Sequence, residues 1–195
     1  MRNHGNIGRV ATLAAAIALL GGCATAEQTE PPPSPAAEIP TTSTAKQAVV
    51  NLSSASASLV SGTLTLVPVA GGVRISGEIG GLQPGRAHGF HVHEKGDCSA
   101  ADASSASGHF NPFSQPHGRD GTGAHHAGDI DNIVANIDGV ARVDVQLAGV
   151  TLGGGAVNDI AGRALIVHAA ADDYTSQPSG NAGARVACGV IKVTM

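Results

Sequence analysis

The segment Arg142–Leu147 reads RVDVQL, so polar and apolar side chains alternate along it. A period of two places Val143, Val145 and Leu147 on one face of a β-strand, toward a core, and the polar side chains on the other face, toward water. Similar short apolar segments, separated by Ser, Gly and Pro, predict further antiparallel strands. The other expected strands are 49–53, 59–67, 73–79, 87–94, 128–136, 162–169 and 185–193. Asp138-Gly139, just before the opening segment, is a good hairpin turn.

The composition favours a single all-β domain with appendages. The chain has 195 residues, with 27 glycines and only 2% aromatic residues, which favours strands and tight turns over packed long helices. About eight strands predict an antiparallel Greek-key β-barrel or an Ig-like β-sandwich. Two long stretches without a regular pattern, 96–127 and about 170–184, are expected to be functional loops. The first is rich in histidine, so metal could supply the order that its local sequence does not.

The N-terminus has the features of a secretory signal. Met1–Gly22 carries two arginines followed by an apolar run that is short for a membrane span. The run closes with Leu20-Gly21-Gly22-Cys23, which resembles the lipobox of bacterial lipoproteins, where the signal is cut before a cysteine that becomes lipidated. We therefore expect Cys23 to carry a lipid. The alternative is an ordinary signal cleaved after a small residue such as Ala24 or Ala26.

Residues 23–45 are expected to form a disordered tether. They are rich in Pro, Thr, Ala and Glu, include three consecutive prolines at 31–33, and contain no apolar periodicity. The folded domain is expected to span residues 46–195. With a lipid at Cys23, this arrangement predicts a protein held to a membrane of the cell envelope, such as a periplasmic lipoprotein. Without the lipid, residues 23–45 are simply a disordered tail.

Cys98 and Cys188 are the two thiols of the expected folded part. Because secretion places them in an oxidising compartment, we expect a disulfide between them, which would tie the first long loop to the last strand. The alternative is two free, buried cysteines. Removal of the signal leaves nine basic and fifteen acidic residues, a net charge of −6. That charge disfavours nucleic acid as a partner.

Seven residues carry metal-ligand chemistry: His91, His93, His109, His117, His126, Asp129 and His168. Two four-coordinate ions need eight protein bonds, one more than seven residues supply singly. An imidazole has two ring nitrogens, so one histidine without ring protons could bind both ions, and a bridged two-metal centre is the first hypothesis. His91 and His93 flank one residue and leave the same face of a strand. The following Glu94-Lys95 lacks the Asp and His of the metallo-β-lactamase pattern, which disfavours a zinc hydrolase.

The order of motifs resembles one known family. The motifs are HGFHVH at 88–93, GHFNP at 108–112, HG at 117–118, HAGD at 126–129, GR at 162–163 with His168, and GNAGARVACGVI at 180–191. Together they resemble copper/zinc superoxide dismutase over about residues 48–193. The close spacing of His93 and Cys98 is similar to the bacterial, secreted lipoprotein branch of that family.

The resemblance implies a specific division of the ligands between two metals. It assigns copper to His91, His93, His109 and His168, and zinc to His109, His117, His126 and Asp129, with the imidazolate of His109 shared. The ligand chemistry agrees, because an all-imidazole set suits copper, whereas three imidazoles and one carboxylate suit a closed tetrahedral zinc site.

Residues around the ligands also match the family. Asp172 corresponds to an aspartate that hydrogen-bonds one copper-binding and one zinc-binding histidine, although Asp172 or Asp173 could instead be a solvated loop charge. Arg185 corresponds to an anion-guiding arginine; the alternative is a surface arginine at a strand end. His125 is expected to be a loop histidine, because the three-residue step from His126 to Asp129 matches the family's pattern. The resemblance implies that His88 is a structural, hydrogen-bonding histidine that supports the loops around the metals.

The activity that the resemblance implies is the conversion of two superoxide anions to oxygen and hydrogen peroxide by alternating Cu(II) and Cu(I). Arg185 and His109 are the residues expected to act on the substrate. The stretch 172–184 departs from the family's animal enzymes, because it contains no Lys and only two acidic residues. Steering by Lys95 or Arg119 is left open, as is a homodimer. Two rival functions are a copper-binding lipoprotein and an adhesive Ig-like module.

Overall fold

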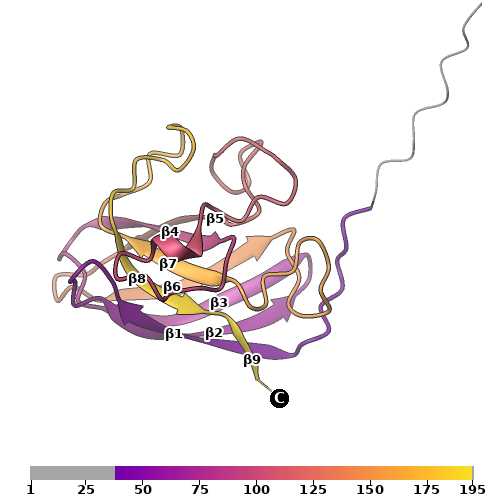
Figure 1. Cartoon of the computed structure of the whole chain (residues 1–195), viewed down its shortest axis with the longest axis horizontal. Coiled ribbons are helices and arrows are strands. Elements are labelled where there is room, and N and C mark those ends of the chain that lie inside the picture. The colour runs from indigo at the N-terminus through magenta and orange to yellow at the C-terminus, as the bar shows by residue number, and fades with distance from the viewer. Residues whose placement is uncertain (1–37, 195) are drawn as a thin grey trace, which may run out of the picture. The chain divides into compact units, whose positions relative to one another are not determined.

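The computed structural model describes residues 38–194, and Figure 1 shows their arrangement. The expected signal peptide, the lipidation at Cys23 and most of the tether lie outside the described residues. The strands are β1 (Gln47–Ser54), β2 (Ser61–Val69), β3 (Gly72–Gly80), β4 (Ala87–His93), β5 (Asp129–Val134), β6 (Ala141–Ala148), β7 (Ala164–His168), β8 (Arg185–Val190) and β9 (Lys192–Thr194), with one 3₁₀ turn, η1 (Ser104–Ala106). Among these elements, none is a helix long and apolar enough to cross a membrane.

The strands form an antiparallel, barrel-like sheet in the order β5-β4-β7-β8-β1-β2-β3-β6. β1, β2, β3 and β6 form one layer, whereas β5, β4, β7 and β8 form the other, and β8 joins β1 through the short pairing of Ser53 with Cys188 and Ser54 with Ala187. Between β3 and its neighbour β6, the chain crosses to the second layer and returns, as Greek-key connections do. The expected all-β Greek-key fold is confirmed.

Strand β6 shows why the alternating pattern of its sequence predicts the core. Val143 and Leu147 are buried and Val145 is half-buried, while Arg142 and Asp144 are exposed. The pairing of β6 with β3 in antiparallel register continues this division across the layer. The inward side chains of both layers form one apolar core that includes Leu64, Leu66, Ile75, Phe90, Leu165 and Val167. Burial of this apolar surface is the main force that holds the layers together.

Three local features differ from the sequence expectations. Asp138-Gly139 does form a turn, but its flanking strands β5 and β6 pair with β4 and β3 instead of forming a hairpin ladder with each other. The last expected strand is interrupted at Ile191, whose backbone N–H donates to the carbonyl of Arg163; β9 then pairs with β1. Residues 40–45 of the expected tether contact the domain, since Thr44 and Ala45 both donate to the carbonyl of Leu152.

Strand β4 divides the core from the polar site. Phe90 and Val92 point into the apolar core, so the alternation of the strand sends His91 and His93 to the opposite face. The loops that follow β4 and β7 rise on that face and cover it (Figure 1). A disulfide between Cys98 and Cys188 fastens the first of these loops to β8, as expected from the cysteine content.

Candidate metal centre

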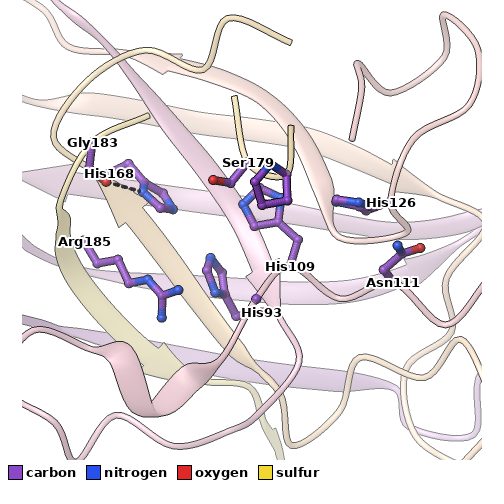
Figure 2. A pocket seen from close by; sticks show the side chains of 10 residues that line it. His93, His109, Asn111, His126, His168, Ser179, Gly183 and Arg185 are labelled. Carbon is purple, nitrogen blue, oxygen red and sulfur yellow. Dashed lines mark hydrogen bonds between the residues drawn. The ribbon is translucent and has the colours of Figure 1, made fainter. Parts of the chain in front are cut away.

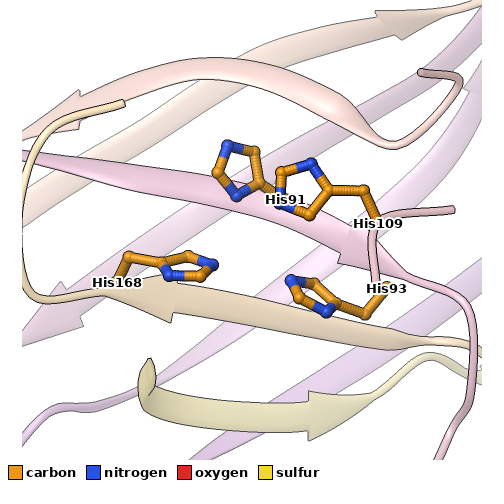
Figure 3. Close-up of side chains that lie close together, drawn as sticks. All are labelled: His91, His93, His109 and His168. Carbon is orange, nitrogen blue, oxygen red and sulfur yellow. The ribbon is translucent and has the colours of Figure 1, made fainter. Parts of the chain in front are cut away.

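Four buried histidines from three segments face one another on the outer side of β4 (Figure 3). They are His91, His93, His109 and His168, and each offers one ring nitrogen within 4.8 Å of the others'. β4 carries the first two, and β7 ends at His168. His109 comes from the first long loop, which a backbone bridge to His93 brings alongside β4. The rings of His91 and His109 lie 4.0 Å apart between centroids.

Hydrogen bonds to fixed acceptors set which nitrogen of each ring remains free. His91 donates from Nε2 to Oδ2 of Asp172 at 2.8 Å, and His93 donates from Nδ1 to the carbonyl of Ser107 at 2.9 Å. His168 donates from Nδ1 to the carbonyl of Gly183 at 3.2 Å. Because a neutral imidazole has one N–H, these bonds leave the other nitrogen of each ring with a lone pair that can bind a metal.

A second group lies on the far side of His109 and contains His109, His117, His126 and Asp129, again with ligand atoms within 4.8 Å of one another. Asp129 begins β5, opposite His91 in the register with β4. Its carboxylate lies 2.7 Å from Nδ1 of His109, and 3.1 and 3.2 Å from Nδ1 of His117 and His126. The backbone N–H groups of Gly118 and His126 also donate to this carboxylate and hold it in place.

His109 connects the two groups. Its Nδ1 faces the carboxylate of Asp129, whereas its Nε2 is buried and has no hydrogen-bond partner among the described residues. The two nitrogens of an imidazole point away from each other, so each belongs to a different group. The structure therefore allows one ring to contribute a ligand to two ions.

The carboxylate of Asp172 forms hydrogen bonds with one histidine of each group. Its Oδ2 accepts from His91 at 2.8 Å and its Oδ1 accepts from Nε2 of His117 at 3.0 Å. Asp172 is itself held by Asn132 on β5, which accepts from its backbone N–H and donates to its carbonyl. Asp172 is buried, unlike Asp173, so the structure places it as an orienting partner of two ligands and not as a solvated charge.

The surroundings keep the rings of His93, His109 and His168 neutral and the carboxylate of Asp129 charged at physiological pH. Burial, with a contribution from His109, lowers the pKa of His93 to about 2, and burial with the neighbouring His91 lowers the pKa of His168 to about 3. Burial also lowers the pKa of His109 to about 4, although its hydrogen bond to Asp129 opposes the shift. Burial alone would raise the pKa of Asp129, but hydrogen bonds from His109 and His126 outweigh it and hold that pKa well below its usual range. Neutral imidazoles and an ionised carboxylate are the forms that bind metals.

The first group opens to solvent through a cavity of about 420 Å³ (Figure 2). His93, His109 and His168 line its floor, and Asn111, Ser179 and Arg185 lie around them. The guanidinium of Arg185 donates to the carbonyls of Ala103 and Ser107, each at 2.6 Å. Ser107 also accepts from His93, so Arg185 and one ligand share an acceptor. Burial lowers the pKa of Arg185, but a guanidinium stays charged at neutral pH and makes the cavity attractive to small anions.

The remaining basic residues that the sequence singled out lie outside both groups. His125 donates to the carbonyl of Gly123 and lies 3.4 Å from Asp120, whereas His88 is buried and donates to the carbonyl of His168. Arg119 forms two hydrogen bonds, each 2.8 Å, with Asp131. That ion pair compensates the charge of Arg119. Lys95 is exposed.

Two residues that support the ligands were missed by the sequence reasoning. Gln177 pairs with the backbone of His117 in both directions: its Oε1 accepts from the N–H at 2.8 Å and its Nε2 donates to the carbonyl at 2.9 Å. Asn132 holds Asp172 as described above. These partners are 60 and 40 residues apart in the sequence, and no local pattern marks either of them.

The residues fit the metals that the ligand types suggest. Nδ1 of His91 and Nε2 of His93, His109 and His168 are buried and have no hydrogen-bond partner in the described part of the chain. Buried polar atoms without partners are costly, and a copper ion that accepts four nitrogen ligands would satisfy all four. The second set, three Nδ1 atoms crowded around one carboxylate, matches the donors of a four-coordinate zinc site. The two clusters could thus hold copper and zinc.

Comparison with known proteins agrees with the two metal-ligand groups. A family model described as copper/zinc superoxide dismutase matches residues 60–191. Copper/zinc superoxide dismutase 1 of Aquifex aeolicus is 44% identical over 134 residues, which cover 67% of this chain and 79% of the relative. The crystal structure of a superoxide dismutase-like protein from Bacillus subtilis is similar with a TM-score of 0.66 and 37% identity, covering 72% of this chain and 95% of that one. The crystal structure of a clock protein gives a TM-score of 0.70 and 38% identity, over 78% and 98% of the two chains.

Proposed function

The chain belongs to the copper/zinc superoxide dismutase family, and we propose that it converts two superoxide anions and two protons to dioxygen and hydrogen peroxide. The observation that carries the proposal is the convergence of four unpaired imidazole nitrogens beside a cavity that three of the four histidines line together with Arg185. Family membership by itself gives the fold, whereas the activity depends on the complete set of residues at the site.

His91, His93, His109 and His168 would hold copper, and His109, His117, His126 and Asp129 would hold zinc. Copper bound there would supply one-electron chemistry, taking an electron from one superoxide as Cu(II) and giving it to a second as Cu(I). The tautomers of three of the copper-side rings are fixed by acceptors in the surrounding protein, so the ligand nitrogens are oriented without rearrangement.

His109 is the residue placed to move a proton. His109 lines the cavity, its Nε2 has no hydrogen-bond partner among the described residues and its Nδ1 faces Asp129, so the ring can take up a proton at Nε2 while its other nitrogen stays held. That proton can then pass to the reduced substrate in the cavity. Arg185 attracts the anion, because its charge lies at the same cavity and its two carbonyl contacts hold it beside His93.

A copper-binding or copper-buffering protein is the second candidate. Storage needs neither a ring shared by two metal groups nor an arginine held at the cavity, and both are present. These features favour catalysis. An adhesive Ig-like module would need none of the metal ligands.

Reconstitution of the full protein with copper and zinc, followed by a superoxide-removal assay, tests the activity. Rapid removal is expected; failure with both metals bound stoichiometrically would support the copper-binding protein instead. The division of ligands is tested by metal analysis of two variants. His109→Ala should lose copper and zinc, whereas His126→Ala should mainly lose zinc, and unchanged zinc in both variants would contradict the assignment.

We further propose that the protein acts at the cell envelope, in or facing the periplasm, with a lipid on Cys23 as its membrane anchor. The support is the apolar signal that ends directly before a cysteine and the Pro-rich segment that follows it. Mass spectrometry of the mature N-terminus tests this directly. A diacylated or triacylated Cys23 is expected, and an unmodified N-terminus after Ala24 or Ala26 would overturn the anchor.

A further inference from the structure

Arg163 lies directly before β7, the strand that ends at the copper-side ligand His168. Its guanidinium carbon lies 3.6 Å from the centroid of the Phe110 ring, which is a close cation–π stack. Phe110 is almost completely buried and follows the bridging histidine His109 in the sequence. One face of the Arg163 side chain therefore packs against a residue in the middle of the first long loop, directly after His109.

The same guanidinium also forms hydrogen bonds with Glu94, the residue that directly follows β4. Nη1 of Arg163 donates to the backbone carbonyl of Glu94 at 2.7 Å and to its Oε1 at 3.1 Å. Glu94 directly follows the ligand His93, and its own N–H donates to the carbonyl of Gly108, the residue before His109. Nε of Arg163 donates to the backbone carbonyl of Asp159 at 2.8 Å, and this bond helps to fix the plane of the guanidinium.

Three chain segments that carry copper-side ligands thus meet at one planar cation. We propose that Arg163 is a positioning residue that sets the relative placement of His93, His109 and His168 and hence the geometry of the copper site. Arg163 contacts the residues that directly follow His93 and His109, and it directly precedes the strand that ends at His168. A lysine could keep the charge but not the flat stack with simultaneous bonds to several carbonyls, because its ammonium is a compact, flexible group.

This inference rests on the proposed copper site, so the test must separate the two. Copper(II) affinity is measured by chelator competition in the zinc-loaded full protein, together with the electron paramagnetic resonance (EPR) spectrum of the bound copper. For Arg163→Lys we expect about 10-fold weaker copper binding, in the range found for residues that orient metal ligands, and an altered spectrum. The control is Arg74→Lys, which removes a two-bond pair with Asp144 on the exposed face of β3 and β6. It should leave both measurements unchanged.

A second variant keeps the test valid if Arg163→Lys does not fold. Phe110→Leu removes the aromatic face but keeps an apolar side chain, and it should change the copper EPR spectrum in the same direction. Wild-type affinity and spectrum in a folded, zinc-loaded Arg163→Lys protein would overturn the inference, as would a wild-type spectrum in Phe110→Leu if only that variant folds. A wild-type protein that binds no copper would instead refute the proposed function.

Discussion

Replacement of Asp172 by Asn should weaken both metal sites while leaving every direct ligand in place. The carboxylate accepts one N–H from His91 and one from His117, through separate oxygens. An Asn side chain has one oxygen and an NH₂ group, so it can accept from only one ring and must turn a donor toward the other. The ring that loses its acceptor also loses the bond that fixes its orientation and tautomer.

The size of the effect follows from the bonds that are lost. A hydrogen bond to a charged group contributes about 1.5–3 kcal/mol, and loss of partners that orient metal ligands typically lowers metal affinity about 10- to 100-fold, or about 1.4–2.8 kcal/mol. One ring loses its acceptor, and the other keeps only a neutral amide oxygen in place of a carboxylate, which is a weaker acceptor. Because His117 belongs to one group and His91 to the other, we expect both the zinc and the copper affinity to decrease, by about 10- to 100-fold at the site whose histidine loses its acceptor and by less at the other.

Chelator competition at neutral pH measures each affinity. Asp173→Asn is the matched control, because it removes the same charge from the next residue, whose carboxylate accepts from Thr175 and Ser176 and contacts no ligand. Its metal affinities should stay within about 2-fold of wild type, well below the 10-fold loss expected for a ligand-orienting residue. Asp172→Asn with wild-type affinity for both metals would refute the role given to Asp172.

Three further predictions follow from the same structure. Replacing Cys98 and Cys188 together by Ala should lower the free energy of unfolding by about 4–5 kcal/mol, because their bridge spans 90 residues; urea unfolding at equal metal loading measures this, and a loss below about 1 kcal/mol would contradict it. Arg185→Glu should slow superoxide removal without releasing copper, and an unchanged rate at low salt would exclude a guiding role. In metal-free protein, the pKa values of His93 and His168 are about 2 and 3, against about 6.5 when unfolded, so the unfolded chain binds protons first as the pH falls. The contribution of these two histidines to the free energy of unfolding should therefore be fully present above about pH 6.5. Below that pH it should fall by up to about 1.4 kcal/mol per pH unit for each histidine, until the pH reaches the pKa of the folded protein. A free energy of unfolding, measured with urea, that does not change between about pH 6.5 and 4.5 would contradict this.

Local sequence patterns predicted much of the fold. The alternation in β6 predicts which side chains are buried, because side chains on a strand point to opposite faces in turn. The same rule places His91 and His93 together, away from the core that takes Phe90. Local pattern did not predict strand pairing at Asp138-Gly139, because a turn of that kind constrains only a few residues, whereas the barrel decides which strands lie next to those it joins.

The sequence also predicted which types of metal ligand the candidate site contains. Residue types and their order along the chain, together with the family resemblance, identified the ligand groups that the structure brings together. The spacing of His168 and Asp172 suggested an orienting carboxylate, and the structure gives it two histidine partners. Charge alone did not show that Arg119, a residue left open for steering, pairs with Asp131 on β5.

Local periodicity, residue counts and recognisable spacing were enough to predict the class of fold, the strands, the cysteine pair and the types of metal ligand. The contacts of Gln177 with His117, of Asn132 with Asp172 and of Arg163 with Glu94 and Phe110 are visible only in the folded chain. These contacts join residues far apart in the chain, and they exist only where strand register and loop closure bring them within hydrogen-bond distance.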